Sequence, residues 1–459
     1  MSSAPSLGIP ELAGLATYAE AARVGFSVEE NVRRLLRLHW TEKRLMETAV
    51  AHLPSTPEWE VKCGLALHQW EDAEHAEALR RRVAEMRHPA PRMDAAPDAA
   101  LDAFLEEVLR ARDTVELLVG IHRVARPALV EVYRRQLAGS NPLVDHPTRR
   151  IVRSLLAEEE EALEWGERAV AALLERDAGA RERAAAWEAH LGAYLAAAGG
   201  IAGDGSAFTG TLPPPRAAEP WTPDTRPRRD ARFGGLHWFD FPPHQVYNAA
   251  GVPADERNLA LLCKRTLEMD VPEMMASVLS ERRDLPWEFR LEYARQLWDE
   301  ARHAMMGTVA FEARGVDWTR IPLNVGFSLR LNRHATPLER QTMLFAIEQS
   351  LMPGDTGKRF EYQTAVEAGD ALSAHFHDYD WADEVLHAQI GRRWMRREGI
   401  TPEEALERAR EIHERTWAAL DGYRDEEPGE WWGDFVRRVL GRESTVRPGE
   451  LGEPRIIAG

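Results

Sequence analysis

The segment that decides the fold spans residues 284–305, DLPWEFRLEYARQLWDEARHAM, because an earlier part of the chain repeats it. Residues 56–77, TPEWEVKCGLALHQWEDAEHAE, align with this segment at a constant offset of 228 residues. The identical positions include two tryptophans and a histidine in each copy: Trp59, Trp70 and His75 against Trp287, Trp298 and His303. Tryptophan is rare, so its recurrence at fixed spacing favours duplication of one structural unit over a chance match of two Ala/Glu/Arg-rich helices.

The repeat extends into the surrounding helical patterns. Residues 156–168 align with residues 381–393, and Gly166 falls opposite Gly391. Long stretches of Ala, Leu, Glu and Arg place apolar residues at i, i+3, i+4 and i+7, whereas alternating strand patterns are scarce. One more amphipathic pattern ends each half: 178–198 and 402–422. The sequence therefore predicts an all-α fold of two tandem helical bundles, each with a four-helix core and an extra helix.

The chain length fits this duplicated architecture. At 459 residues the chain is roughly three times a typical domain length. Its composition changes to Gly, Pro and polar residues between 199 and 245, where a packed helix is not expected. The predicted division is an N-terminal bundle, a Gly/Pro-rich linker, a C-terminal bundle and a tail: 1–198, 199–245, 246–425 and 426–459.

The charge balance and cysteine count exclude several classes of protein. Lys+Arg number 58 against 75 Asp+Glu, which gives a net charge of -17 and argues against nucleic-acid or anionic-membrane partners. No apolar run approaches the roughly 20 residues that span a bilayer, and the N-terminus lacks the features of a secretory signal. Cys63 and Cys263 are too few for a disulfide scaffold or a cysteine-built metal site. We expect a cytoplasmic protein, monomeric or homodimeric.

Metal-binding residue types recur on the four helices expected in the second half of the chain. These helices are predicted over 254–282, 286–314, 336–367 and 371–398. The second and fourth carry the same motif, Glu300-x-x-His303 and Glu384-x-x-His387. A spacing of i, i+3 places a carboxylate and an imidazole on one helix face. The first and third each offer a glutamate within an apolar stretch: Glu268 and Glu348.

Hairpin geometry places these groups at one level of the bundle. Glu268 and Glu300 each lie sixteen residues from the centre of the turn near residue 284. Glu273, the rival on the first helix, would be displaced by roughly 7 Å at 1.5 Å per residue. Glu348 and the second motif lie at similar distances from the turn at 367–370. We therefore expect four carboxylates and two imidazoles in one layer of the core.

Such a layer has a specific chemical meaning. Four glutamates inside a bundle would repel one another, and stay protonated, unless a cation neutralised them. Oxygen and imidazole donors without thiolate suit a pair of iron or manganese ions. A bundle with surface glutamates and partly buried histidines is the simpler interpretation of the same residues.

This pattern resembles the ferritin-like superfamily of di-iron and di-manganese carboxylate proteins, here as a tandem double-bundle member. Their ligands are one glutamate from each of two helices and a Glu-x-x-His motif from each of the other two. The implied metal ligands are Glu268, Glu300, His303, Glu348, Glu384 and His387, with Glu300 and Glu384 also given catalytic roles. The resemblance covers the second half closely and the first half loosely.

The resemblance also implies a function. We expect an O2-dependent oxidase or oxygenase that uses two iron ions, with manganese as the alternative metal. O2 is the co-substrate, a small organic molecule is the substrate, and an external electron donor is compatible with this chemistry. Hydroxylation, desaturation and N-oxygenation all fit. The alternatives are a ferroxidase, a manganese-catalase-type peroxide enzyme and a metal-free helical interaction protein.

The first half carries an incomplete version of the same layer. Its equivalents are Glu42, Asp72, His75, Glu116 and Glu159. The position that matches His387 is Ala162, and Asp72 is shorter than the glutamate it replaces. We expect a degenerate copy that is kept for packing, with a working second site as the alternative.

Several neighbours of the second-half motifs leave alternatives open. His377 and Asp380 precede Glu384 on nearly the same helix face. Three roles are open for them: an extra metal ligand, partners that orient the imidazoles, or polar residues near a helix start. Tyr293 lies two turns before Glu300, and its role is either that of a core residue or that of a hydrogen-bond donor near the metals. Residues 352–358 interrupt the third helix and offer an opening for substrate.

Overall fold

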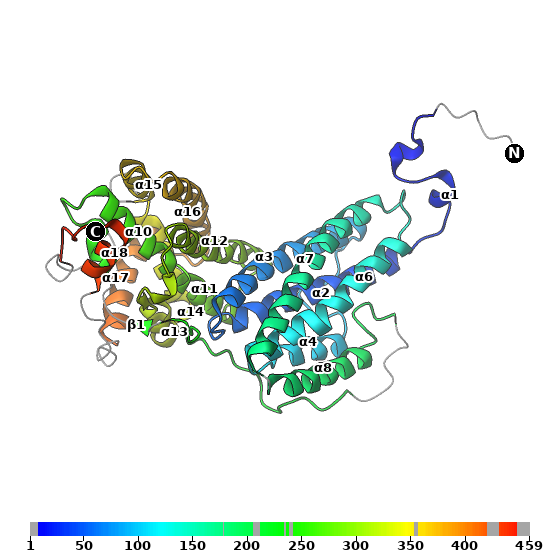
Figure 1. The fold of residues 1–459 in the computed structure, drawn as a ribbon. Coiled ribbons are helices and arrows are strands. Elements are labelled where there is room, and N and C mark those ends of the chain that lie inside the picture. The colour runs from blue at the N-terminus through cyan, green and yellow to red at the C-terminus, as the bar shows by residue number, and fades with distance from the viewer. Residues whose placement is uncertain are drawn as a thin grey trace. The chain divides into compact units, whose positions relative to one another are not determined.

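The computed structural model of the chain is predominantly helical, which confirms the predicted all-α class (Figure 1). It describes residues 8–177, 179–204, 212–233, 236–237, 242–352, 357–419 and 431–447. Within them, strand is confined to one parallel pair, β1 (Leu236–His237) with β2 (Leu323–Asn324). No helix in the described residues is long and apolar enough to cross a membrane.

The chain divides into two compact units. Unit 1 comprises Met1–Thr48 and Glu71–Trp221, and unit 2 comprises Ala49–Trp70 and Thr222–Gly459. The described residues between 199 and 233 form no helix. The division into two bundles, a linker and a tail remains a prediction.

Unit 1 is built from long helices that surround a buried polar cluster. Its main elements are α2 (Val28–His52), the later part of α3 (Trp59–Met86), α4 (Ala99–Leu109), α5 (Thr114–Val119), α6 (Arg126–Gly139), α7 (His146–Arg176) and α8 (Ala180–Ala197), preceded by η1 (Glu11–Gly14) and α1 (Tyr18–Ala21). Helix α6 packs against α7, and α8 packs against α4 and α5. A short π-helix, η2 (Gly120–Ala125), joins α5 to α6.

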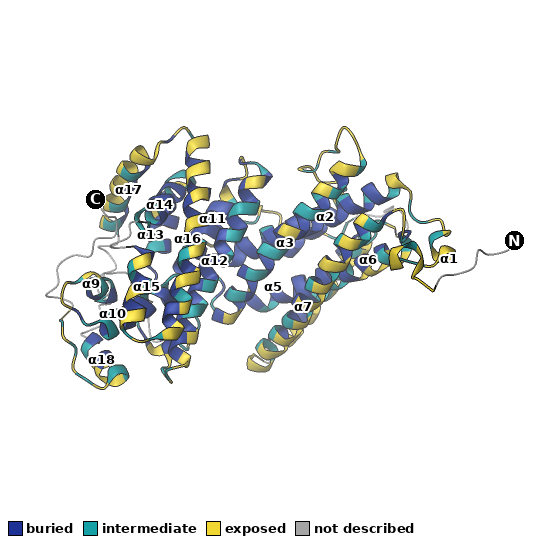
Figure 2. Cartoon of the chain, turned by 90° about the horizontal axis from the view of Figure 1, so that it is seen from above, coloured by how far each residue is buried: buried dark blue, intermediate teal, exposed yellow. Residues whose placement is uncertain are grey.

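Unit 2 is a set of helices with α12 near its centre, packed against α10, α11 and α16. Its elements are α9 (Pro242–Asn248), α10 (Ala254–Leu267), α11 (Asp270–Glu281), α12 (Trp287–Glu312), η3 (Trp318–Arg320), α13 (Gly326–His334), α14 (Pro337–Ser350), α15 (Lys358–Glu367), α16 (Ala371–Arg397), α17 (Pro402–Ala418) and α18 (Trp432–Leu440). Helix α16 also packs against α14 and α15. Figure 2 shows α12 largely buried, whereas α16 exposes one face.

Two of the helices predicted for this region are interrupted. The predicted helix over 254–282 is two helices, because α10 ends at Leu267 and α11 begins at Asp270. Pro272 explains this break, since proline has no N–H to donate to the carbonyl of Glu268 four residues earlier. The predicted interruption near 352–358 is present between α14 and α15. Helices α9, α13 and α18 were not predicted, and α9 begins inside the segment 199–245 that was expected to form a linker.

Candidate metal centre

The core of unit 2 brings together the six predicted metal ligands and Asp380, in two adjoining groups. One group contains Glu300, Glu348, Glu384 and His387; the other contains Glu268, His303 and Asp380. Within each group the ligand atoms lie within 4.8 Å of one another. The groups come from α12, α14 and α16 and from Glu268, which caps the C-terminus of α10. On α12 and α16, several polar residues lie on the buried face of the helix.

The first group converges on Nδ1 of His387. This atom lies 3.3 Å from Oε1 of Glu300 and 3.4 Å from Oε2 of Glu384. Oε1 of Glu348 is 3.9 Å away. None of these four residues is more than 3% exposed, so the group is shielded from water.

The second group converges on Nδ1 of His303. Oδ1 of Asp380 lies 3.2 Å from this atom, and Oε2 of Glu268 lies 3.8 Å from it. Oε2 of Glu300 is 3.7 Å away, so the two oxygens of Glu300 face the two imidazoles. The ring centroids of His303 and His387 are 5.9 Å apart. Glu300 therefore stands where a bridging carboxylate between two cations would stand.

The outer nitrogen of each imidazole faces an aspartate on the other motif helix. Nε2 of His303 lies 3.1 Å from Oδ2 of Asp383, and Nε2 of His387 lies 3.4 Å from Oδ2 of Asp299. A carboxylate in this position holds the proton on Nε2 and leaves the Nδ1 lone pair free for a metal. Neither aspartate was predicted as a functional residue, although each directly precedes the glutamate of its motif, which makes the motif Asp-Glu-x-x-His.

Some of the buried oxygen and nitrogen atoms that would bind a metal have no hydrogen-bond partner, and this bears on whether these residues fit a metal pair. Within the described residues such atoms occur throughout the two groups: Oε2 of Glu348, Oε2 of Glu384, Oδ2 of Asp380, and Nδ1 of His303 and His387. A buried polar atom without a partner is costly, and a coordinated cation would remove that cost. Carboxylate oxygens with imidazole nitrogens are a donor set that iron and manganese accept. The residues therefore fit the metal pair.

Two cations that the sequence did not predict border the second group. Nζ of Lys358 lies 2.8 Å from Oε1 of Glu384 and 2.9 Å from Oδ1 of Asp380. The guanidinium of Arg265 lies 2.7 Å from Glu268 and 2.6 Å from Asp380. Both cations are buried and offset part of the negative charge of the carboxylates.

The close packing of carboxylates and imidazoles in a buried site raises the pKa values of three of these side chains. Burial, with the neighbouring charge of Glu384, raises the pKa of Glu348 well above its usual value. Burial disfavours the protonated form of His303, but Asp380 and the hydrogen bond to Asp383 outweigh it and raise its pKa to about 10. For His387 too, burial is outweighed, chiefly by the neighbouring carboxylates of Asp299 and Glu300, and its pKa is raised. The metal-free groups therefore retain protons that a cation would displace.

The structure also places the residues for which the sequence left alternatives. Asp380 lies within the second group, whereas His377 belongs with Asp380 and Glu361 in a separate buried group. Burial and then Arg265 lower the pKa of His377 to about 4. Tyr293 is buried, and burial followed by the charge of Glu348 raises its pKa. Most of the segment proposed as an opening, 353–356, lies outside the described residues.

Glu273, the rival of Glu268, takes no part in either group. Its Oε1 lies 2.6 Å from Nζ of Lys62, and it also pairs with Arg229. All three side chains are at most 3% exposed, so Glu273 belongs to a buried ion-pair cluster. Glu273 therefore lies outside both candidate groups, as its displaced height on the first helix predicts.

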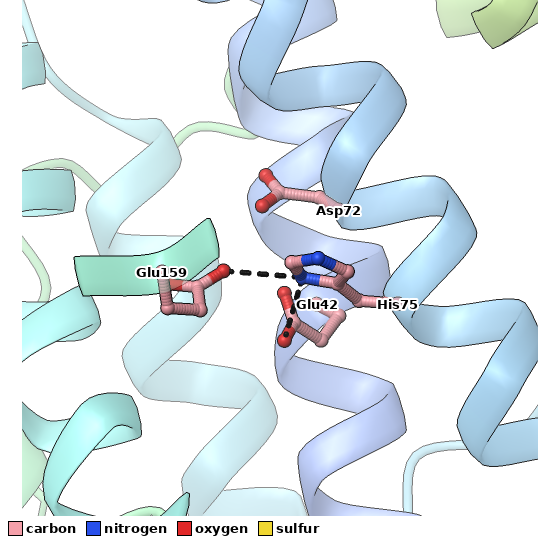
Figure 3. A group of neighbouring side chains, drawn as sticks. All are labelled: Glu42, Asp72, His75 and Glu159. Atoms are coloured by element: carbon pink, nitrogen blue, oxygen red, sulfur yellow. Dashed lines mark ion pairs between the residues drawn. The ribbon is translucent and has the colours of Figure 1, made fainter. Parts of the chain in front are cut away.

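Unit 1 brings together four of its five candidates: Glu42, Asp72, His75 and Glu159 (Figure 3). Glu116 is not part of this group. Glu116 instead forms an ion pair with Arg216. The sequence placed Glu116 on a third helix level with the others. That placement is wrong: in the first turn of α5, the carboxylate of Glu116 accepts a hydrogen bond from the backbone N–H of Arg112 and pairs with Arg216. Arg126 contacts Glu159 and Asp72 of the cluster instead.

Comparisons of the chain with protein-family models, with curated proteins and with solved structures return no match. The chemical meaning of the two clusters therefore rests on their own residues. The cluster in unit 2 has two imidazoles that share one carboxylate, and the cluster in unit 1 has a single imidazole.

Proposed function

We propose that unit 2 holds two iron ions and acts as a non-haem di-iron, O2-dependent oxidase or oxygenase on a small organic substrate. The observation that carries this proposal is the position of Glu300, whose two oxygens face Nδ1 of His303 and Nδ1 of His387. Manganese suits the same donors. The proposal includes a ferritin-like arrangement of the helices, in two tandem copies.

The side chains divide the task of holding the metals. His303, Glu268 and Asp380 would hold one ion, and His387, Glu348 and Glu384 would hold the other. Glu300, whose two oxygens face both imidazoles, would contribute to both. Two ferrous ions held there would supply electrons for the reduction of O2. Asp383 and Asp299 fix the orientation of the imidazoles by accepting a hydrogen bond from each Nε2.

The surroundings of the two groups favour redox chemistry over storage of a freely exchanging ion. The carboxylates of both groups have little contact with water, since even Glu268 keeps only 11% of its side chain exposed. Exclusion of water protects a reactive oxidant from side reactions. Lys358 adds a fixed positive charge beside Glu384, where it stabilises negative charge that develops near the metals.

Oxygen consumption by the iron-loaded protein tests this function. The full chain is loaded with ferrous iron without oxygen, supplied with a chemical reductant and exposed to O2 in an oxygen electrode. We expect sustained O2 uptake in the wild type and at least a tenfold loss in Glu300→Ala. Glu288→Ala alters an exposed glutamate of the same helix and should leave uptake unchanged. Equal uptake in wild type and Glu300→Ala would rule out the proposed centre.

The same preparations separate the proposal from its nearest alternatives. A ferroxidase would consume O2 only in proportion to added ferrous iron, and the reductant would not sustain uptake. A manganese-catalase-type enzyme would instead release O2 from hydrogen peroxide when loaded with manganese. A metal-free interaction protein would retain neither metal after gel filtration.

A further inference from the structure

The buried cluster of unit 1 has the form of a site for one cation. Glu42 comes from α2, Asp72 and His75 from α3, and Glu159 from α7, and Figure 3 shows their side chains converging between the helices. Each of the four is at most 2% exposed. Nδ1 of His75 lies 3.5 Å from Oε1 of Glu42 and 3.3 Å from Oε1 of Glu159. The imidazole therefore points into the cluster rather than toward solvent.

Every member of the cluster has a buried oxygen or nitrogen atom that could bind a metal and has no hydrogen-bond partner within the described residues. These atoms are Oε2 of Glu42, Oδ2 of Asp72, Nδ1 of His75 and Oε2 of Glu159. A packing cluster would pair these atoms with donors, because an unpaired buried polar group costs free energy. Each of the four residues offers one ligand atom, three carboxylate oxygens and one imidazole nitrogen in all, and these ligand atoms lie within 4.8 Å of one another.

Further contacts orient these donors. Nε2 of His75 hydrogen bonds to Oε2 of Glu158 at 2.7 Å, which leaves Nδ1 available as an acceptor. The hydroxyl of Tyr133 donates to Oε1 of Glu42 and leaves the other oxygen of that carboxylate free. The imidazole–carboxylate contact repeats, in unit 1, the arrangement found around His303 and His387.

Arg126 sets how many cations the cluster can take. It donates to Oε1 of Glu159 at 2.6 Å and to Oδ1 of Asp72 at 2.7 Å. It is the first residue of α6, directly after the π-helix, and it is 1% exposed. Three carboxylates and one guanidinium leave two negative charges when the histidine is neutral. One divalent cation would balance this remaining negative charge.

We propose that unit 1 binds a single divalent transition-metal ion through Glu42, Asp72, His75 and Glu159, with Arg126 in the place of a second ion. Oxygen and nitrogen donors without thiolate suit Mn²⁺, Fe²⁺, Co²⁺ or Zn²⁺. This inference does not depend on the oxidase proposed for unit 2. It replaces the expected packing role of the first-half residues with a mononuclear site.

Metal content after loading with Co²⁺ alone tests this site. The full metal-free chain is dialysed against Co²⁺, freed of excess metal by gel filtration, and analysed by mass spectrometry for cobalt per chain. We expect His75→Ala to lose one equivalent relative to wild type. The matched control is His190→Ala, which removes another imidazole of unit 1 that contacts a carboxylate, with Nε2 at 2.8 Å from Oε1 of Glu107. The control should retain the wild-type content.

Two further variants make the result decisive if His75→Ala does not fold. Glu42→Gln keeps the side-chain volume and an oxygen for Tyr133, and should also lose one equivalent. The double variant His303→Ala/His387→Ala leaves unit 1 intact and should retain one equivalent. Wild-type cobalt content in folded Glu42→Gln, or no cobalt in the double variant, would overturn the inference.

The cobalt counts also separate failure of this site from failure of the proposed function. If both proposals hold, wild type binds three equivalents and His75→Ala binds two. If only the unit 1 site exists, wild type binds one and His75→Ala binds none. If only the unit 2 pair exists, both proteins bind two.

Discussion

Nε2 of His387 lies 3.4 Å from Oδ2 of Asp299, and these two residues stand on different helices, α16 and α12. The reciprocal contact joins His303 on α12 to Asp383 on α16 at 3.1 Å. Each Asp-Glu-x-x-His motif therefore supplies the aspartate that orients the imidazole of the other. This exchange couples the geometry of the two half-sites.

Replacing either aspartate should weaken metal binding without removing a ligand. Loss of a carboxylate that orients a metal-bound histidine typically costs 10–100-fold in metal affinity. We expect Asp299→Asn and Asp383→Asn each to raise the dissociation constant for iron or manganese by roughly this factor, as measured by competition with a chelator. Asp378→Asn alters an exposed aspartate of α16 and serves as the control. Unchanged affinity in both motif variants would contradict the orienting role.

Lys358→Met should make the metal-free protein less stable and its response to metal larger. The substitution leaves the buried carboxylates of Asp380 and Glu384 without their ammonium partner, and breaking a buried ion pair costs about 3–5 kcal/mol. A divalent cation would restore the lost positive charge. Thermal unfolding with chelator and with metal measures both effects.

Lys264→Met is the matched control for this experiment. Lys264 contacts Glu361, outside the two groups around His303 and His387, so its loss should lower Tm without a larger metal-induced rise. A rise in Tm on metal addition that is the same in wild type and Lys358→Met would show that Lys358 is not electrostatically linked to the metals.

Metal binding to unit 2 should release protons and strengthen as the pH rises. Although burial opposes it, Asp380 with Asp383 raises the pKa of His303 to about 10, so this side chain is a positively charged imidazolium at pH 7.5 in the metal-free protein. A ligating histidine must be neutral, and the cation therefore competes with that proton. Each displaced proton makes the apparent affinity rise about tenfold per pH unit below the pKa.

Calorimetry in two buffers of different ionisation enthalpy counts the released protons directly. We expect proton release on loading of the wild type between pH 6.5 and 8, with a tighter apparent dissociation constant at the higher pH. An affinity that falls with rising pH, or binding without proton release, would contradict the assigned protonation of the metal-free site.

Gly391→Ala should destabilise unit 2 by overpacking. A Cβ atom at this position would lie 2.6 Å from Cδ2 and 3.3 Å from Cβ of Phe345, which is buried on α14. Overpacking of this kind costs typically about 1–3 kcal/mol. Gly192→Ala is the control, since nothing lies within 4 Å of its added Cβ and alanine favours a helix by roughly 0.5–1 kcal/mol. Measured by chemical denaturation, the free energy of unfolding should fall in Gly391→Ala and rise in Gly192→Ala. An unchanged or higher free energy of unfolding in Gly391→Ala would contradict this packing.

The sequence predicts helices and their polar inward positions better than it predicts the cations between them. Glu300 and Glu384 could be placed because helical periodicity and hairpin length fix both the face and the height of a side chain. Lys358, Arg265 and Arg126 could not, since a long flexible side chain reaches several ångströms from its own helix position. Their role depends on tertiary distances that no local pattern encodes.

The aligned glycines show what the repeat preserves. Gly391 leaves room for Phe345 on α14, and Gly166 leaves room for His122 in the π-helix of unit 1. The aligned position therefore has the same packing role in both units, although the partner side chains differ. The π-helix was not predicted, because one short π-helical segment shifts the spacing of the apolar residues by only about one position.

Anomalous diffraction at the iron edge, from crystals of the iron-loaded full chain, tests the central claim most directly. We predict two iron peaks in unit 2, one beside Nδ1 of His303 and one beside Nδ1 of His387, separated by roughly 3.5–4 Å with Glu300 between them. A single peak in unit 2, or none within coordination distance of these two nitrogens, would contradict the dimetal centre.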